Sequence, residues 1–252
     1  MAKVPIALQL YTVRDHTAED FAGTVEKVAQ IGYAGVEFAG FGGMSADKVK
    51  ELLDRCGLKA AGAHIGLDLL EKNLEQTLEE QLVIGNKWVV CPYMPEDRRK
   101  DGAAWKSLAS LLNEIGAACK EKGLVFCYHN HAFEFEKFDG VYGLDLLYGN
   151  VDPALVFGEV DTFWVKKGGE CPAGFIRKYC GRIPLVHLKD MTKDEEATFA
   201  EVGCGSMDFA SIFEAAEACG AEWYIVEQDR CAGDSLESAR TSFDNLKKMG
   251  KA

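Results

Sequence analysis

The sequence predicts an α/β protein of the (β/α)₈ TIM-barrel class, with a single domain over residues 1–252. Eight short apolar runs recur along the chain, amphipathic segments separate them, and 252 residues is the usual size of one such barrel. Each run is too continuously apolar for a strand with one solvent-exposed face, so each fits a strand buried on both faces of a parallel sheet. A doubly wound open sheet is the alternative, but the chain has no G-x-G-x-x-G after its first strand and no G-x-x-x-x-G-K-[ST].

The predicted strands are short and rich in Val, Ile, Leu and aromatic residues, as strands in a parallel barrel are. In chain order they are VPIALQLY from Val4, AGVEFAG from Ala34, KAAGAHIG from Lys59, NKWVVCPY from Asn86, LVFCYHNH from Leu124, ALVFGEVD from Ala154, IPLVHLKD from Ile183 and WYIVEQD from Trp223.

Parallel strands need crossover connections, and the segments between the runs have the periodicity of helices. The first helix is expected to start after an N-cap at Thr17 and to end near Gly32. The segment 45–56 repeats this design, with Gly57 directly after its end. Further helices are expected over residues 69–84, 103–122, 208–219 and 235–249, with two shorter ones near 141–149 and 172–180.

Charge and composition exclude several classes of partner. The formal net charge is −12, which disfavours nucleic acid because that affinity depends on Lys and Arg contacts to phosphates. No run of eighteen apolar residues occurs, so we expect no membrane partner and a cytoplasmic location. The nine cysteines form no C-x-x-C pair, and we expect reduced thiols. The oligomeric state is open, with a homo-oligomer as one alternative.

Polar groups follow the apolar part of the last three runs, where a (β/α)₈ barrel carries its chemistry. Alternate residues of a strand share a face, and these faces converge on one axis. The paired side chains, strand by strand, are Glu159 with Asp161, His187 with Lys189, and Glu227 with Asp229.

Histidines gather at the same predicted mouth. His64 ends the third strand, and His129, His131 and Glu134 follow the fifth, so four of the five histidines lie at strand ends. Nitrogen and oxygen ligands without thiolates suit Mn²⁺, Mg²⁺, Co²⁺ or Zn²⁺. The sequence therefore predicts one divalent metal ion at the barrel mouth.

A resemblance runs along essentially the whole chain. The segments LQLYTVR, GAHIG, YHNHAFEF, EVDTFW, VHLKD, EVGCGSMDF and VEQD, in this order, resemble the sugar phosphate isomerase/epimerase family with its xylose isomerase-like barrel. Members include ketose 3-epimerases, hydroxypyruvate isomerase and 2-keto-myo-inositol dehydratase. The resemblance implies a single metal held by Glu, Asp, His and Glu from strands five to eight, and Asp161, His187 and Glu227 match the last three positions.

The fifth strand departs from this pattern. Many relatives carry Glu before the Asn that is Asn130 here, whereas this chain has His129. YHNHAFEF is closer to the dehydratase branch, so Glu134 is the predicted first ligand and His129 the alternative. In the family's epimerases the first and last glutamates form the acid/base pair, which would be Glu134 and Glu227 here.

The remaining mouth residues are predicted to act on substrate. His64 and His131 are candidates for proton transfer beside Glu134 and Glu227. Each assignment has a structural alternative: Asp161 could cap a helix, His187 could be a core histidine, and Glu134 could belong to a solvated loop. The predicted substrate contacts are Lys189, His129, Glu159, Trp164 and Arg230.

A divalent ion on a carbonyl oxygen stabilises the enediolate left when a proton leaves the adjacent carbon. The sequence therefore predicts a metal-dependent isomerase or epimerase of a ketose or related keto-sugar. Loss of a β-substituent from the same intermediate makes a lyase or dehydratase of a keto-inositol or 3-keto-glycoside the alternative. A non-catalytic sugar-binding barrel is the alternative from another class, and the negative charge disfavours a nuclease.

Overall fold

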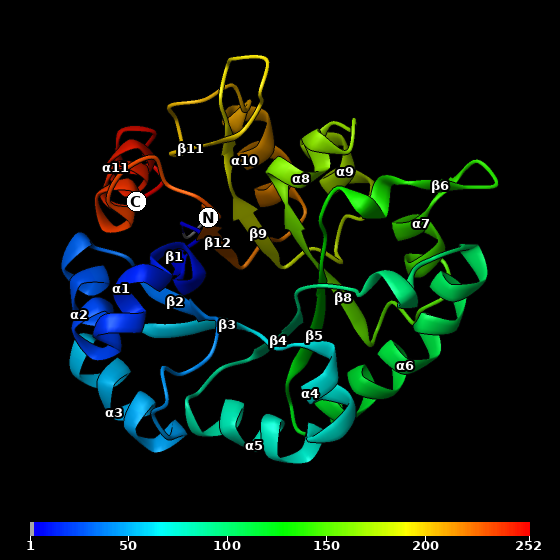
Figure 1. The fold of residues 1–252 in the computed structure, drawn as a ribbon, viewed down its shortest axis with the longest axis horizontal. Coiled ribbons are helices and arrows are strands. Elements are labelled where there is room, and N and C mark those ends of the chain that lie inside the picture. Colours follow the sequence, from blue (N-terminus) through cyan, green and yellow to red (C-terminus); the bar gives the residue numbers. More distant parts are fainter. Residues whose placement is uncertain (1–2) are drawn as a thin grey trace.

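The computed structural model describes residues 3–252, which form a closed barrel of eight parallel strands (Figure 1). All eight predicted strands and the barrel class are confirmed. The last strand pairs with the first, and Ile6 lies opposite Tyr224 in that register. The strands are β1 (Ile6–Gln9), β2 (Gly35–Phe38), β3 (Lys59–His64), β4 (Trp88–Cys91), β5 (Val125–His129), β8 (Val156–Asp161), β9 (Leu185–Leu188) and β12 (Trp223–Val226).

Helices form a ring around the barrel (Figure 1). Except for α1, which has no buried residue, the helices turn apolar side chains toward the strands, and the layer between helices and strands is the larger part of the core. The helices are α1 (Arg14–Glu19), α2 (Phe21–Ile31), α3 (Ala46–Cys56), α4 (Leu67–Lys72), α5 (Leu74–Val83), α6 (Gly102–Glu121), α7 (Gly143–Tyr148), α8 (Thr162–Lys167), α9 (Pro172–Lys178), α10 (Phe209–Ala218) and α11 (Ser235–Lys248).

Helix boundaries differ from expectation at two places. The N-cap of α2 is Asp20, whose carboxylate accepts the Gly23 N–H at 2.9 Å, while Thr17 lies inside the additional helix α1. The segment expected as one helix over 69–84 is two helices, because Asn73 has φ −133° and ψ 32° and ends α4 before α5 begins. Gly57 ends α3 as expected, with a left-handed φ of 68°.

Short elements at the mouth were not predicted. Single-turn 3₁₀ helices follow β1 (Leu10–Val13), precede α6 (Glu96–Arg98) and follow β5 (Phe133–Phe135). Two antiparallel pairs join β6 (Lys137–Phe138) to β7 (Val141–Tyr142) and β10 (Asp190–Met191) to β11 (Phe199–Ala200). These segments carry side chains of the mouth on loops that begin where the barrel strands end.

The barrel interior changes from apolar to polar along the strands. Apolar residues fill one end, and they are Ala7, Ala61, Trp88, Val90, Cys127, Leu185, Trp223 and Ile225. At the other end of the barrel Gln9, Glu37, Glu159, Asp161 and His187 are each fully buried. Buried charge persists only when it is paired or hydrogen-bonded, so this layer needs an internal network of partners.

The expectation that all cysteines are reduced is wrong for one pair. Cys180 and Cys219 form a disulfide, with their Cα atoms 4.7 Å apart. They follow α9 and α10, whose ends lie together although the two cysteines are 39 residues apart in sequence. Cys91, Cys119 and Cys127 are buried free thiols. Within residues 3–252, none of the helices combines the length and apolar composition needed to cross a bilayer.

Candidate metal centre

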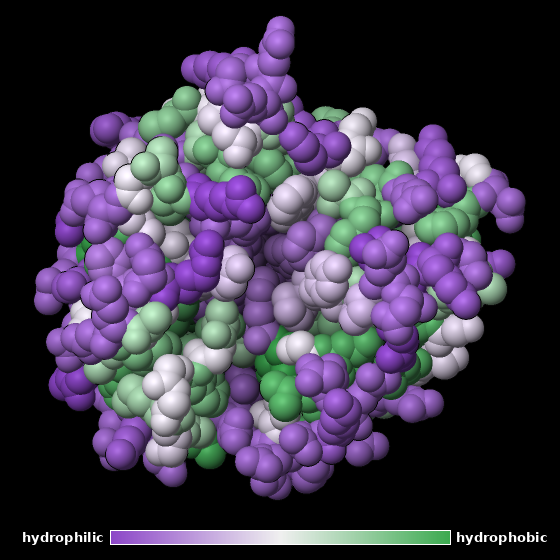
Figure 2. Space-filling view, in the orientation of Figure 1, coloured by the Kyte–Doolittle hydropathy of each residue, from purple (hydrophilic) through white to green (hydrophobic). Residues whose placement is uncertain are grey.

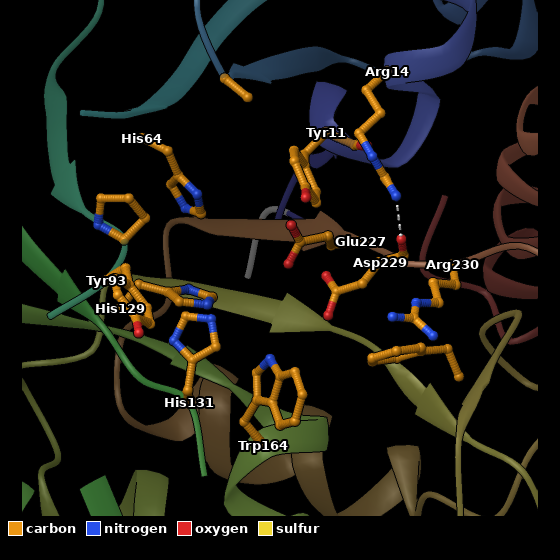
Figure 3. Close-up of a pocket in the computed structure, with 13 residues that line it drawn as sticks. Tyr11, Arg14, His64, Tyr93, His129, His131, Trp164, Glu227, Asp229 and Arg230 are labelled. Carbon is orange, nitrogen blue, oxygen red and sulfur yellow. Dashed lines mark hydrogen bonds between the residues drawn. The ribbon is translucent and has the colours of Figure 1, made fainter. Parts of the chain in front are cut away.

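The mouth of the barrel holds a pocket of about 730 Å³, large enough for a sugar-sized molecule. Figure 2 shows a hollow near the centre of the molecule with hydrophilic side chains around it. His129 and Glu227 line its floor, and Tyr93 and Trp164 stand on its wall (Figure 3).

Four side chains from successive strands meet beneath this pocket. His129 ends β5, Asp161 ends β8, His187 lies in β9 and Glu227 follows β12. Their potential ligand atoms all lie within 4.8 Å of one another, and all four residues are buried. A His₂Asp/Glu₂ set of this kind matches the ligands that Mn²⁺, Co²⁺ and Zn²⁺ take in proteins.

Each histidine of this cluster is held from behind by a second carboxylate. His129 Nδ1 lies 2.9 Å from Glu159 Oε2, and His187 Nε2 lies 2.7 Å from Glu37 Oε2. The opposite ring nitrogens face the cluster: His129 Nε2 is 3.9 Å from Asp161 Oδ2 and His187 Nδ1 is 3.0 Å from Glu227 Oε2. A carboxylate behind a histidine fixes its tautomer and orients its free nitrogen toward a metal.

Glu37 was missed in the sequence analysis. It is fully buried at the end of β2, and its Oε2 also accepts from Gln9 Nε2 at 2.8 Å. The run VEFAG contained the signal for Glu37. Glu159 was selected because it is a polar residue near the end of a predicted barrel strand, and Glu37 has the same position in the second strand.

A second grouping of His64, His129, Glu159 and His187 also brings its ligand atoms within 4.8 Å. It shares His129 and His187 with the first cluster. His64 Nε2 lies 2.7 Å from Glu159 Oε2 and 3.3 Å from Glu37 Oε2. The Glu37 and Glu159 carboxylates therefore contact the imidazoles of His64, His129 and His187. This second grouping supports the first cluster from below.

Lys189 shows that the cluster attracts positive charge. Its side chain is 1% exposed, and its ammonium lies 3.0 Å from Asp161 Oδ2, 2.8 Å from Glu227 Oε2 and 2.9 Å from Asp229 Oδ1. Burial alone would raise the pKa of Glu227, but Lys189 and His187 outweigh it and hold that pKa well below its ordinary value. Glu227 is therefore ionised at neutral pH.

The donor set fits a divalent ion on two further grounds. Burial lowers the pKa of His129 to about 3, so its imidazole is neutral and keeps a free lone pair. Buried carboxylate oxygens lack a hydrogen-bond donor: Glu37 Oε1, Glu159 Oε1 and Asp161 Oδ2. Asp161 Oδ2 makes no hydrogen bond, and the Lys189 ammonium lies 3.0 Å from it.

Glu134, the predicted first ligand, belongs to neither grouping. It lies in the 3₁₀ turn after β5, where its Oε1 accepts from the Tyr128 hydroxyl at 2.9 Å and its Oε2 from the His131 N–H at 2.8 Å. Burial raises its pKa to about 8. The side chain thus supports the turn that carries His131, and His129 is the fifth-strand residue in the cluster.

His131 and His64 line the pocket, and their pKa values are shifted in opposite directions. Burial, followed by His129 and Lys189, lowers the pKa of His131 to about 2, and its Nδ1 is buried without a partner. Burial also lowers the pKa of His64, but the Glu37 and Glu159 carboxylates outweigh it and the net shift is upward. The pocket therefore presents one neutral imidazole and one that favours the protonated form.

The predicted substrate contacts divide into two layers. Trp164 and Arg230 line the pocket, as does His129, whereas Lys189 and Glu159 are buried below it. The His131 ring stacks on Phe133 with centroids 5.4 Å apart, and Trp164 lies at the same centroid distance. Asp161 also caps α8 by accepting the Trp164 N–H at 3.1 Å, so the structural role considered for it exists beside its place in the cluster.

Residues 25–249 match the xylose isomerase-like TIM barrel family. The chain belongs to this family. It is 27% identical to an inosose dehydratase of Clostridium beijerinckii over 90% of this chain and 89% of that protein. It is 25% identical to an inosose dehydratase of Geobacillus kaustophilus over 86% of this chain and 82% of that protein.

Solved structures agree with the fold. A sugar phosphate isomerase/epimerase from Parabacteroides distasonis superposes with a TM-score of 0.85 at 24% identity, over 98% of each chain. An L-ribulose 3-epimerase superposes with a TM-score of 0.70 at 16% identity, over 100% of this chain and 95% of that one. These structures share the fold of this chain, and its relatives by sequence are named as enzymes.

Proposed function

We propose that this protein is a divalent-metal-dependent lyase that eliminates a β-oxygen substituent from a keto-polyol, such as a keto-inositol or keto-sugar. The observation that carries the proposal is the residue that the fifth strand contributes to the cluster. His129 lies in the cluster, whereas Glu134 is hydrogen-bonded outside it. The pair of glutamates expected for an epimerase is therefore not assembled around the cluster. The similarity to proteins named inosose dehydratase supports the same reading.

His129, Asp161, His187 and Glu227 would hold the metal. When bound, a divalent ion supplies a Lewis acid that stabilises negative charge on the substrate's carbonyl oxygen. Because Glu37 and Glu159 fix the two histidines, the protein sets the orientation of this donor set before substrate arrives.

Proton transfer falls to the two imidazoles of the pocket. His131 lines the pocket, and its imidazole accepts the proton from the carbon next to the carbonyl. His64 donates a proton to the β-hydroxyl, which leaves as water while the C–O bond breaks and a C=C bond forms. Proton exchange with solvent then returns both imidazoles to their starting protonation states, and no oxidant or reductant is consumed.

An isomerase or epimerase acting on a ketose is the second candidate. The Glu227 carboxylate is ionised and lines the same pocket as His131 (Figure 3). Two groups able to carry a proton at different places around a sugar could return the proton to another face or another carbon.

Mass spectrometry in deuterium oxide separates the two reactions. The Mn²⁺-loaded protein is incubated with a panel of ketoses, keto-inositols and 3-keto-glycosides, with the His187→Ala variant as the metal-depleted control. A lyase releases water or the glycosidic substituent and leaves an unsaturated ketone, whereas an isomerase or epimerase exchanges or moves hydrogen without loss of mass. If the metal-loaded protein shows neither elimination nor movement of hydrogen with any compound of the panel, the non-catalytic sugar-binding barrel is the function that remains.

A further inference from the structure

Two arginines on one side of the pocket keep an uncompensated charge. Arg14 and Arg230 both line the mouth pocket, close to Asp229 (Figure 3). Across residues 3–252, neither guanidinium lies within ion-pair distance of a carboxylate. Both arginines line a pocket, so their unpaired guanidiniums face whatever ligand that pocket holds.

Arg14 is held in place by groups that carry no net charge. It donates from Nη1 to the Tyr11 carbonyl at 2.9 Å and from Nη2 to the Asp229 carbonyl at 2.8 Å. Its guanidinium also lies 4.2 Å from the centre of the Tyr11 ring. A guanidinium has five N–H donors, so three remain and the positive charge is positioned without being neutralised.

The nearby carboxylates already have partners. Asp229 Oδ1 pairs with the Lys189 ammonium at 2.9 Å, and Asp15 Oδ1 accepts from the Ser235 hydroxyl at 2.6 Å. Arg230 makes no side-chain hydrogen bond within the described residues, and only its backbone carbonyl is used, by Gln228. Internal acidic groups thus leave the two guanidinium charges available to a ligand.

There is room for a substituent beside these arginines. A second cavity of about 490 Å³ borders the mouth pocket and shares Arg14, Asp229 and Arg230 with it. The histidines and Tyr93 stand across the mouth pocket from the two arginines (Figure 3). A ligand over the metal-binding cluster could therefore extend one end between the two guanidiniums.

We propose that Arg14 and Arg230 form an anion-binding subsite, and that the substrate of this site carries a carboxylate or a phosphate group. This inference rests on the proposed function for the identity of the pocket as the reaction site. Guanidinium groups bind both anions through paired N–H donors. Because the whole protein repels anions, a local pair of unneutralised cations is what would admit an anionic sugar to this acidic mouth.

Binding of three matched sugars tests the subsite without turnover. Isothermal titration of the Mn²⁺-loaded protein with glucose, glucuronate and glucose 6-phosphate compares a neutral sugar with its carboxylate and phosphate forms. We expect at least one anionic sugar to bind about tenfold more tightly than glucose, with the preferred form identifying the group. Equal binding of all three overturns the inference.

Variants assign the preference to the arginines. Arg14→Gln and Arg230→Gln should each weaken the preferred anionic sugar by about tenfold and leave glucose unchanged. Arg55→Gln is the matched control, because Arg55 is an exposed arginine in the last turn of α3, at the opposite end of the barrel. Loss of the preference only in the control, or in none of the variants, overturns the assignment.

The metal-depleted His187→Ala variant separates this inference from the proposed function. If the arginines bind the anion, this variant keeps the preference for the anionic sugar without metal. If the metal binds the anion, the preference disappears in this variant and the inference is overturned. If the preference persists but the loaded enzyme eliminates nothing from any keto-sugar, the proposed function fails and the subsite stands.

Discussion

Replacing Glu134 by glutamine tests whether this carboxyl is a buried neutral acid or a metal ligand. The side chain is fully buried, and burial raises its pKa from the ordinary 4.5 to about 8. Since the folded pKa exceeds the unfolded one, the contribution of Glu134 to stability is complete below pH 4.5 and is lost as the pH rises through 8. Between pH 5 and pH 8 this group lowers the free energy of unfolding by about 4 kcal/mol.

Glutamine cannot ionise, so the stability of the variant relative to the wild type rises by about 4 kcal/mol over the same interval. Its amide oxygen can accept the His131 N–H, and its NH₂ can donate to the Tyr128 hydroxyl. The Tyr128 hydroxyl then loses its own acceptor, which costs about 1 kcal/mol at pH 5.

Urea titrations of the metal-free protein at pH 5, 6.5 and 8 measure the difference. Mn²⁺ affinity, measured by calorimetry on both proteins, should be unchanged. A stability difference that is constant with pH would refute the buried-acid reasoning, and a loss of Mn²⁺ affinity would show that Glu134 is a ligand.

Three further predictions follow from the same contacts. His129→Ala lowers Mn²⁺ affinity by about tenfold or more in calorimetric titrations, while His16→Ala, outside the mouth pocket, leaves it unchanged. Equal losses of Mn²⁺ affinity in the two variants contradict a ligand role for His129. Glu227→Gln keeps a neutral oxygen donor but lowers turnover by about 10²-fold, and wild-type turnover excludes an essential charge there. Asp20→Ala removes the cap on Gly23 N–H and lowers the free energy of unfolding by about 1 kcal/mol, seen in urea titrations, with no change in Mn²⁺ affinity.

The barrel was determined by the sequence itself, for a local reason. A strand buried on both faces must be apolar along its length, so the pattern of eight runs is visible without any long-range contact. The strand-end rule also directed attention to Asp161, His187 and Glu227, which the structure brings together. Their polar side chains interrupt apolar runs at the same end of each strand, and one sequence is enough to see that.

The tertiary structure alone decided which group of the fifth-strand segment enters the cluster. His129, His131 and Glu134 lie within six residues, and the 3₁₀ turn after β5 directs Glu134 to Tyr128 instead of the cluster. The support from Glu37 reaches His187 across 150 residues of sequence, which no local pattern encodes. Which imidazole is neutral likewise depends on burial and on charges from other strands, because a pKa is set by the surroundings that folding assembles.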